Sequence, residues 1–349
     1  TSPWLYRFRM PAIAPIVIDV LNMAVQMEHH RAVYGGFSSA IQDYVDLHVF
    51  ERFNTVAGQA LLKIVDPFQY RDRLTMPKLI INSTGDEFFV PDSAQYYFKQ
   101  LGGENYLTYA PNTNHGMGGY TTAAPLLAPW FQSIAAGKTD RPAFSWTASD
   151  DNTRIEVVTQ TKPDRVLLWK ATSSNRDFRL STNWSSSELP QTALNRYVAE
   201  PARSQTAWTG FFVQVIYESA YALNGESTPF KMCTELRVAP PKTPVPPKAG
   251  LSWDTDAPVV GQVIQFSDLT AEGTSPVVSW TWDFGDDSPV SRVKDPQHVY
   301  TAAGAYTVQL DVISLAGTSS VTKMINVGLG GEGEGEGEGE GEGEGEGEG

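Results

Sequence analysis

A proline-rich segment, A-P-P-K-T-P-V-P-P-K-A-G at residues 239–250, constrains the fold of this chain more than any other feature. Proline fixes its own φ, lacks a backbone N–H and restricts the residue before it, so such a run forms neither a helix nor a central strand. Segments of this composition are stiff, extended linkers. The chain therefore has to fold as separate units on either side of it, and its 349 residues suggest two or three domains in all.

Residues 1–138 have the pattern of an α/β domain. The run P-A-I-A-P-I-V-I-D-V at 11–20 is nearly unbroken in apolar character, which predicts a strand covered on both faces. Further strands are predicted at 77–82 and 105–110. Apolar residues at helical spacing predict a helix-rich region over 23–74, a helix over 93–101 and a last helix that ends near Gly137.

The pattern changes to an all-β one after residue 138. Segments that alternate apolar and polar residues, including R-V-L-L-W-K-A-T, F-R-L-S-T-N-W and G-F-F-V-Q-V-I-Y, predict a β-sandwich-like domain over 139–238. A second β module is predicted over 251–328, where Tyr306, Val308, Leu310 and Val312 share one face of a strand. A tail is predicted at 329–349; from residue 330 it is a run of Gly and Glu without apolar residues, so we expect it to be disordered and self-repelling.

Composition excludes several classes of protein. The formal charge of −14 is dominated by the nine Glu of the tail, and no basic patch suggests nucleic-acid binding. No apolar run is long enough to predict a membrane span, and no signal peptide precedes Thr1 in this sequence. Cys233 is the single cysteine, so an internal disulfide and a cysteine-based metal site are excluded. No cofactor is expected.

Two polar residues follow neighbouring predicted strands. Asp86 comes after the strand at 77–82, and His115 ends the N-T-N-H that follows the strand at 105–110. An α/β-hydrolase carries its nucleophile, acid and base in the order Ser, Asp or Glu, His, each in a loop at the carboxyl end of a strand. Asp86 would hold the imidazole of His115 in one tautomer, and His115 would take the proton of the nucleophile. The alternative is that Asp86 caps a turn and His115 is a solvated loop residue.

The sequence offers one candidate for the nucleophile in this order. G-F-S-S-A at 36–40 approximates G-x-S-x-G and places Ser38 before Asp86 and His115. A nucleophile elbow needs a strand directly before it, whereas the preceding Q-M-E-H-H-R-A-V-Y-G-G is a poor buried strand. We therefore expect Ser38 to begin a helix or to pack, rather than to act as a nucleophile.

Several stretches of the first 240 residues resemble a known family. They are A-I-A-P-I-V-I-D-V-L-N-M, Y-G-G-F-S-S-A-I-Q-D-Y, L-L-K-I-V-D-P-F-Q-Y-R-D-R-L-T-M-P-K-L-I-I-N-S-T-G-D-E-F-F-V-P-D-S, Y-A-P-N-T-N-H, W-K-A-T-S-S-N-R-D-F-R-L and T-E-L-R-V. Together they make residues 10–240 similar to the PhoPQ-activated pathogenicity-related family. The resemblance implies an α/β-hydrolase-like domain with a serine nucleophile on an elbow turn, Asp86 in the acid position and His115 in the base position. It also implies that 139–238 is the β-rich domain of that family.

This sequence departs from the family pattern at its start. The family carries the serine elbow immediately before A-I-A-P-I-V-I-D-V, where this chain has T-S-P-W-L-Y-R-F-R-M. The resemblance therefore implies an N-terminally truncated copy, in which the elbow, the oxyanion donors and the first half of the sheet are missing. The three predicted strands would be the last three of a hydrolase sheet, and a half sheet would leave one strand edge unpaired.

Other polar residues in this region suggest weaker hypotheses. Glu28, His29 and His30 are adjacent, but a helical metal pair needs His at i and i+4, so solvated or packing roles are favoured over metal binding. Asp92 follows Pro91 and precedes a predicted helix, which favours an N-cap and leaves Asp92 as an alternative acid. No metal residue is therefore assigned.

The second β module resembles a polycystic kidney disease (PKD) domain. The resemblance rests on W-D-F-G-D at 282–286, H-x-Y at 298–300 and G-x-Y-x-V at 304–308. Trp282 and Phe284 are expected to face its core. Such domains are extracellular spacers or adhesion modules, and some bind calcium through Asp clusters; the candidate ligands here are Asp254, Asp256, Asp283 and Asp286. The resemblance implies a bacterial protein that is secreted or held at the cell surface.

Two functions follow from these observations. In the first, the chain is part of a secreted serine hydrolase that acts on a peptide or ester, and it retains the acid and base without the nucleophile. In the second, the β modules bind an extracellular protein or polysaccharide and the α/β part is inert. Exposed Trp169, Trp184 or Trp208 would serve the second function, although packing in the core is the commoner use of tryptophan.

Overall fold

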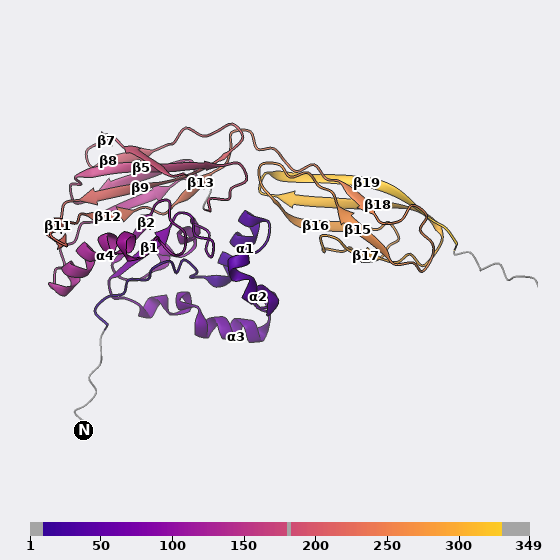
Figure 1. Ribbon diagram of the computed structural model, residues 1–349, viewed down its shortest axis with the longest axis horizontal. Helices are drawn as coiled ribbons and strands as arrows, with labels where there is room; N and C mark the ends of the chain where they lie inside the picture. Colours follow the sequence, from indigo (N-terminus) through magenta and orange to yellow (C-terminus); the bar gives the residue numbers. More distant parts are fainter. Residues whose placement is uncertain (1–9, 180–182, 330–349) are drawn as a thin grey trace, which may run out of the picture. The chain divides into compact units, whose positions relative to one another are not determined.

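The computed structural model describes residues 10–179 and 183–329, and it divides into two compact units (Figure 1). The first unit comprises Thr1–Lys248, Ala271–Val278 and Val312–Ser319, and the second comprises Ala249–Thr270, Ser279–Asp311 and Ser320–Gly349. The Gly/Glu tail, predicted to be disordered, lies outside the described residues from residue 330 onward. The observed architecture is a mixed α/β region followed by β-sandwich domains, as the sequence predicts.

A small parallel sheet forms the centre of the α/β region. β1 (Lys78–Ser83) pairs in parallel with β2 (Asn105–Ala110), from Lys78 opposite Asn105 to Ser83 opposite Ala110. Every residue of β1 is buried, because the sheet is covered on both faces. The two strands confirm the predictions for 77–82 and 105–110.

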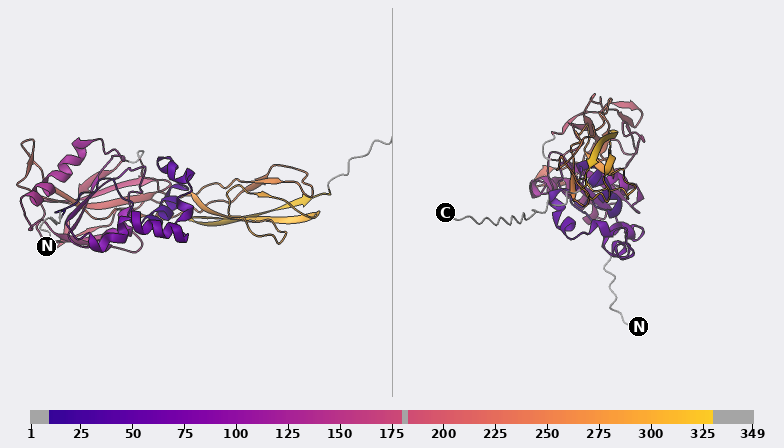
Figure 2. Two further views of the ribbon diagram at one scale, coloured as in Figure 1. Left: turned by 90° about the horizontal axis from the view of Figure 1, so that it is seen from below. Right: turned by 90° about the vertical axis from the view of Figure 1, so that its right-hand side faces the viewer.

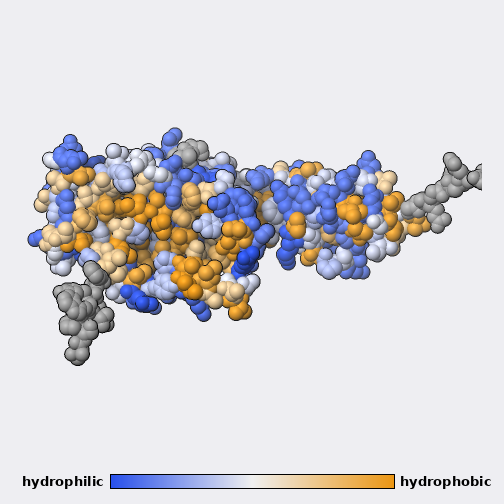
Figure 3. Space-filling model, turned by 60° about the horizontal axis from the view of Figure 1, so that its bottom comes forward, coloured by the Kyte–Doolittle hydropathy of each residue, from blue (hydrophilic) through white to orange (hydrophobic). Residues whose placement is uncertain are grey.

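The segment at 11–20 was expected to be a strand covered on both faces, and this expectation is wrong in part. It pairs in parallel with β1 only through isolated bridges at Ile13 and Ile16, and Ile18 is 43% exposed. Pro11 and Pro15 lack a backbone N–H, which limits the regular pairing of the segment. Within the described residues, the backbone hydrogen bonds of this segment go to the β1 side, at Pro77, Leu79 and Ile81. Figure 3 shows apolar side chains gathered on one face of the first unit.

Helices surround this sheet. The helix-rich region contains the α-helices α1 (Met23–Tyr34), α2 (Gln42–Asp46) and α3 (Val56–Val65) and the 3-10 helices η1 (Ser39–Ile41), η2 (Phe50–Arg52) and η3 (Pro67–Arg73). The predicted last helix is α4 (Tyr120–Ala135). The helix predicted over 93–101 is wrong, because two 3-10 turns form instead, η4 (Ser93–Tyr96) and η5 (Phe98–Gln100). Tyr97 interrupts them with a φ of −143°, and both Tyr97 and Phe98 are buried. A continuous helix would point these adjacent rings about 100° apart.

The β-rich domain that follows consists of two antiparallel sheets. One has the order β3-β4-β8-β7 (Phe144–Ala148, Ile155–Thr159, Arg196–Ala199, Gln191–Ala193), and the other has the order β12-β9-β5-β6 (Phe230–Cys233, Trp208–Tyr217, Arg165–Ser173, Ser185–Glu188), with β13 (Arg237–Ala239) also paired to β9. A short hairpin joins β10 (Ala222–Leu223) to β11 (Glu226–Ser227). Part of the F-R-L-S-T-N-W stretch, predicted as a strand, lies outside the described residues at 180–182.

The β-rich domain packs against the parallel sheet (Figure 1). Every residue of β9 is buried, and the phenol of Tyr109 in β2 accepts a hydrogen bond of 3.2 Å from the backbone of Leu236. Trp184 and Trp208 are 4% and 6% exposed, so neither can serve as an exposed binding residue. Trp169 is half-buried and stacks on Phe212. Core packing, the commoner use of tryptophan, is therefore the observed one.

The predicted second β module lies mostly in the second unit. Its three-stranded sheets are β14-β15-β17 (Leu251–Trp253, Ile264–Asp268, Gln297–His298) and β16-β18-β19 (Val277–Asp283, Gly304–Ser314, Gly317–Val327), and Figure 2 shows them in two further views. Val308, Leu310 and Val312 are fully buried along one face of β18, as the alternation predicts. Trp282 and Phe284 lie in the core as expected. His298 is stacked on Phe284 and lies 2.8 Å from Asp286.

Candidate active site

The loops that follow β1 and β2 meet at the carboxyl end of the parallel sheet. Because Ser83 and Ala110 are register partners, the chain that leaves each strand enters the same region. The backbone of Gly85 donates to the carbonyl of Thr113 over 2.9 Å, and the hydroxyl of Thr113 donates to that of Ser83 over 3.0 Å. These bonds tie the two loops together within a few residues of Asp86 and His115.

Asp86 and His115 form a hydrogen-bonded pair, which we call the dyad. Nδ1 of His115 lies 3.0 and 3.1 Å from the two carboxylate oxygens of Asp86. The Asp86 side chain is 4% exposed and the His115 side chain 27%. An imidazole that donates from Nδ1 to a carboxylate has its Nε2 free to accept a proton. The geometry therefore suits an acid and base pair of the hydrolase type.

The surroundings of the dyad fix its orientation. Oδ1 of Asp86 also accepts hydrogen bonds from the backbone N–H groups of Phe88 and Phe89, and the ring of Phe88 lies 4.2 Å from the His115 ring. Glu87 accepts from the backbone N–H of His115 over 3.0 Å. Burial raises the pKa of Asp86 above 3.8, and its hydrogen bonds and the nearby imidazole offset part of that rise.

Ser38 is engaged elsewhere. It is the N-cap of η1, and its hydroxyl accepts from the backbone N–H of Ala40 over 3.3 Å, which confirms the predicted role at a helix start. Its backbone N–H donates to Nε2 of His30, and Arg179 donates to its hydroxyl over 3.4 Å. Burial lowers the pKa of His30 to about 4, with Arg179 and His29 contributing, so His30 is a neutral acceptor here. Among the described residues, the hydrogen bonds of His115 reach Asp86 and Glu87, not Ser38.

Comparison with known families identifies both parts of the chain. Residues 6–179 match the PhoPQ-activated pathogenicity-related protein family, and residues 244–328 match the PKD domain. The chain thus contains a PhoPQ-related region and a PKD domain. The family match ends within the β-rich domain, so the likeness of the residues after 179 to the β-rich domain of the family stays a prediction.

One curated relative of the chain is autocrine proliferation repressor protein A of Dictyostelium discoideum. It is 32% identical over 259 residues, which cover 68% of this chain and 52% of that protein. The chain therefore spans about half the length of this relative. The name of that relative describes an autocrine repressor of proliferation.

Solved PKD domains resemble the second β module. The PKD1 domain of the Vibrio cholerae metalloprotease PrtV is 24% identical, with a TM-score of 0.22, over 24% of this chain and all of that one. The PKD1 domain of Vibrio anguillarum Epp is 28% identical, with a TM-score of 0.23, over 25% of this chain and 99% of that one. Because the TM-scores are below 0.5, the identification of the PKD domain rests on the family match.

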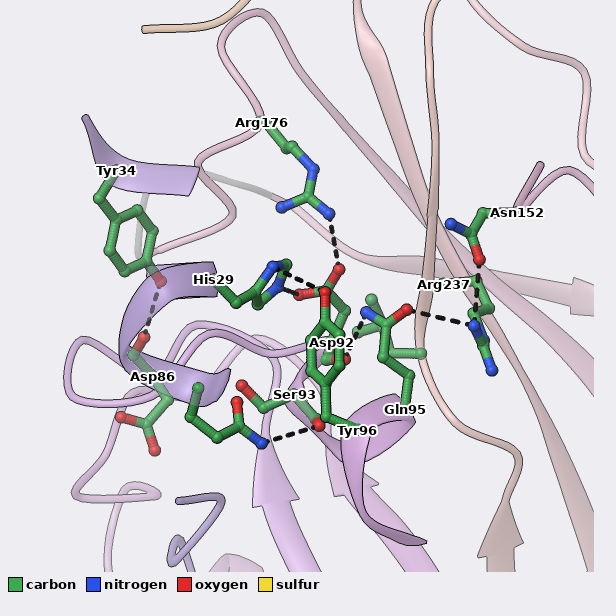
Figure 4. A network of polar contacts seen from close by, with 12 residues as sticks. His29, Tyr34, Asp86, Asp92, Ser93, Gln95, Tyr96, Asn152, Arg176 and Arg237 are labelled. Carbon is green, nitrogen blue, oxygen red and sulfur yellow. Dashed lines mark hydrogen bonds and ion pairs between the residues drawn. The ribbon is translucent and has the colours of Figure 1, made fainter. Parts of the chain in front are cut away.

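A second histidine–carboxylate pair in the PhoPQ-related region was not predicted. Asp92, which is 1% exposed, lies 2.6 Å from Nε2 of His29 and accepts from Arg176 over 2.8 Å (Figure 4). Nδ1 of His29 lies 3.0 Å from the hydroxyl of Tyr96. Burial would raise the pKa of Asp92, but the charges of His29 and Arg176 outweigh it and hold the pKa well below 3.8.

Two expectations about these residues are corrected by this pair. The N-cap role of Asp92 is wrong, because its carboxylate makes no capping hydrogen bond to η4 and is turned toward His29 and Arg176 instead. Of the solvated and packing roles expected for the adjacent histidines, the solvated one is not observed and the packing one is, since the His29 side chain is 8% exposed and His30 1%. Asp92 as the alternative acid has no support from contact with His115, whose carboxylate partner is Asp86.

No metal centre is found in the part of the chain that the structure describes. Over residues 10–179 and 183–329, no three His, Cys, Asp or Glu side chains gather in a way that could hold a metal ion. The four Asp residues considered for calcium in the PKD domain are therefore not assembled as a site. Over the same residues, no helix has the combination of length and apolar character that crossing a bilayer requires.

Asp19 is a buried carboxyl group near the dyad that the sequence analysis did not single out. It lies in the segment at 11–20 and is 3% exposed. Tyr97 and Asn82 lie near it, but its carboxylate oxygens have no hydrogen-bond partner among the described residues. Burial raises its pKa well above 3.8, and the charges of Asp86 and Asp92 add to the rise. Asp19 therefore holds its proton at pH values at which an exposed Asp is ionised.

Asp19→Asn is expected to raise the free energy of unfolding at pH 7. A carboxyl group whose pKa is higher in the folded state binds more protons there, so the stability of the wild type falls as the pH rises above 3.8. Asn has no proton to lose and escapes this penalty. Urea denaturation at pH 7 and at about pH 3 should show a gain for Asp19→Asn only at pH 7. The exposed Asp72→Asn is the control with no expected gain, and a loss of stability for Asp19→Asn at both pH values would contradict the assignment.

Proposed function

We propose that the PhoPQ-related region carries the acid and base of a serine hydrolase, with Asp86 as the acid and His115 as the base. The observation that carries the proposal is the dyad itself, a buried carboxylate on Nδ1 of a partly exposed imidazole at the carboxyl end of a parallel sheet. Nε2 of His115 would take the proton of a serine hydroxyl, and Asp86 would stabilise the imidazolium. Peptides and esters are the substrate classes that this chemistry serves.

The nucleophile lies outside the described residues in this proposal. The hydroxyl of Ser38 is held by Ala40 and Arg179, and its backbone N–H by His30. A serine that His115 activates has to lie within about 3 Å of Nε2, and no described residue is hydrogen-bonded there. We therefore expect the chain as given to be inactive unless another segment supplies the serine.

We further propose that the protein acts outside the cell. PKD domains occur as extracellular modules, and the name of the Dictyostelium relative describes an autocrine factor, which by definition acts from outside. The PKD domain would then serve as a spacer or as an adhesion module for an extracellular protein or polysaccharide. Since the buried Trp184 and Trp208 offer no binding surface, the hydrolase proposal has more support than the binding one.

Labelling with a fluorophosphonate probe tests the proposal. The chain as given, and its Ser38→Ala variant, should both remain unlabelled, because Ser38 is not activated by His115. The complete gene product should be labelled, and His115→Ala or Asp86→Asn in it should abolish or strongly slow the labelling. Labelling of the present chain that disappears in Ser38→Ala would overturn the placement of the nucleophile. The hydrolase proposal would be overturned if the complete gene product is not labelled, or if its His115→Ala variant is labelled as fast as the wild type.

A further inference from the structure

The loop that carries Asp86 is held at both of its ends by helix α1. We call this loop, Gly85–Asp92, the acid loop; it has no helix or strand of its own. Near its start, the hydroxyl of Tyr34 makes a long contact of 3.5 Å with the backbone carbonyl of Asp86. At its end, the carboxylate of Asp92 lies 2.6 Å from His29 (Figure 4). Tyr34 and His29 are both residues of α1, so one rigid element contacts the two ends of the loop.

A segment of the β-rich domain adds a further interaction at each of these two contacts. The segment Ser173–Arg179 begins at the last residue of β5, and we call it the arginine loop. It contributes both cations. Arg176 donates to Oδ2 of Asp92 over 2.8 Å, opposite His29. The guanidinium of Arg179 lies 4.0 Å from the centre of the Tyr34 ring, a cation–π distance. At one end of the acid loop an arginine of this segment thus pairs with Asp92, and at the other end a second arginine packs on Tyr34.

The backbone of the arginine loop indicates that these contacts determine its conformation. Arg176 has a φ of 71°, in the left-handed region that a non-glycine residue adopts only at a cost. Its side chain is 9% exposed, and it also lies 5.4 Å from the Trp208 ring. Such a conformation persists only where surrounding contacts impose it, and the buried Asp92 is the charged partner that does so here.

From these contacts we infer that His29, Tyr34, Arg176 and Arg179 are positioning residues of the dyad, and that the β-rich domain completes the candidate active site. We call the four residues the loop clamp. The inference rests on the proposed function of the dyad. Asp86 can hold His115 only while the acid loop keeps its carboxylate within hydrogen-bond distance, and a loop without helix or strand needs outside contacts to stay in place. The loop clamp supplies these contacts from two elements that are distant in sequence.

Amide hydrogen exchange in the acid loop tests the loop clamp directly. The backbone N–H groups of Phe88 and Phe89 donate to Oδ1 of Asp86, so their exchange rates report on whether this carboxylate is in place. Arg176→Ala should speed their exchange at least about tenfold, while amides of β9 keep their rates. The ¹⁵N spectrum of the His115 ring should change from a single Nδ1–H tautomer to a mixture. Arg176→Lys should restore part of both readouts, because a cation again faces Asp92.

Controls separate the loop clamp from general destabilisation. Arg165→Ala removes an exposed arginine paired with Glu188 and should leave exchange at Phe88 and Phe89 unchanged. Tyr34→Phe, which removes one hydroxyl, carries the test if Arg176→Ala does not fold, and should speed exchange at the start of the acid loop. Unchanged exchange and an unchanged His115 spectrum in folded Arg176→Ala would overturn the inference. These readouts need no catalysis, whereas failure of the proposed function would show as absent probe labelling of the complete gene product with the loop clamp intact.

Discussion

Trp282→Ala is expected to lower the free energy of unfolding of the PKD domain by about 3–5 kcal/mol. Trp282 is fully buried and is one of the largest side chains in the core, with its ring 5.8 Å from that of Phe266. Its indole N–H donates to the carbonyl of Lys294 over 3.2 Å. Alanine would leave a cavity and a carbonyl without its donor, two costs that add.

Denaturation of the full chain in urea, followed by near-ultraviolet circular dichroism, would measure this effect. A domain of this size is stable by roughly 4–13 kcal/mol, so the loss removes a large part of its stability. The matched control is Trp280→Ala on the same strand, because Trp280 is only half-buried and its N–H is bonded to Asp268. Equal losses for the two variants would show that Trp282 does not anchor the core. A loss confined to the transition of the other unit would contradict the assignment of Trp282 to the PKD domain.

The β modules and the central strands could be predicted because their patterns are local. Alternation at period two follows from the geometry of a half-buried strand, and it identified the buried face of β18 at Val308, Leu310 and Val312. The apolar run before Asp86 identified β1 by another local signal, the unbroken apolar character of a strand covered on both faces. The segment at 11–20 has similar apolar character, but its regular pairing is limited by Pro11 and Pro15. Periodicity reports on burial, and it says less about which backbone groups are available to pair.

The helix predicted over 93–101 failed for a tertiary reason. S-A-Q-Y-Y-F-K-Q-L has good helical composition, yet both Tyr97 and Phe98 are buried in the structure. Burial of adjacent large side chains favours a break between two short turns over a continuous helix. Local helix propensity carries no information on which side chains tertiary packing will bury, so the break at Tyr97 could not be predicted from the sequence.

The dyad could be predicted and the loop clamp could not, and the difference is one of sequence distance. Asp86 and His115 follow adjacent parallel strands, so topology alone brings them to the same edge of the sheet. Asp92 and Arg176 are 84 residues apart, one in a region with the pattern of an α/β domain and the other in a region with an all-β pattern. The W-K-A-T-S-S-N-R-D-F-R-L stretch supported the family resemblance, but nothing in it indicated that Arg176 would meet a buried carboxylate.

Asp92→Ala is expected to lower the free energy of unfolding of the PhoPQ-related region by about 3–5 kcal/mol. The variant leaves Arg176 and His29, whose side chains are 9% and 8% exposed, without their common partner. A buried charge that loses its counter-ion costs more than the pair itself contributed, because the remaining charge has no water to solvate it. Urea denaturation at 25 °C would measure the loss.

The pH dependence of this loss identifies its cause. The pKa of Asp92 is lowered in the folded state, so its contribution is fully present above its usual 3.8 and is lost only as the pH falls through the lowered value. The deficit of Asp92→Ala should therefore be present at about pH 5 and should shrink only as the pH falls well below 3.8. Glu188→Ala, which removes the exposed partner of Arg165, should cost less than about 1 kcal/mol. If the two variants cost the same, the Asp92 pair is no stronger than a surface contact, and the acid loop would be anchored only at its other end, by Tyr34.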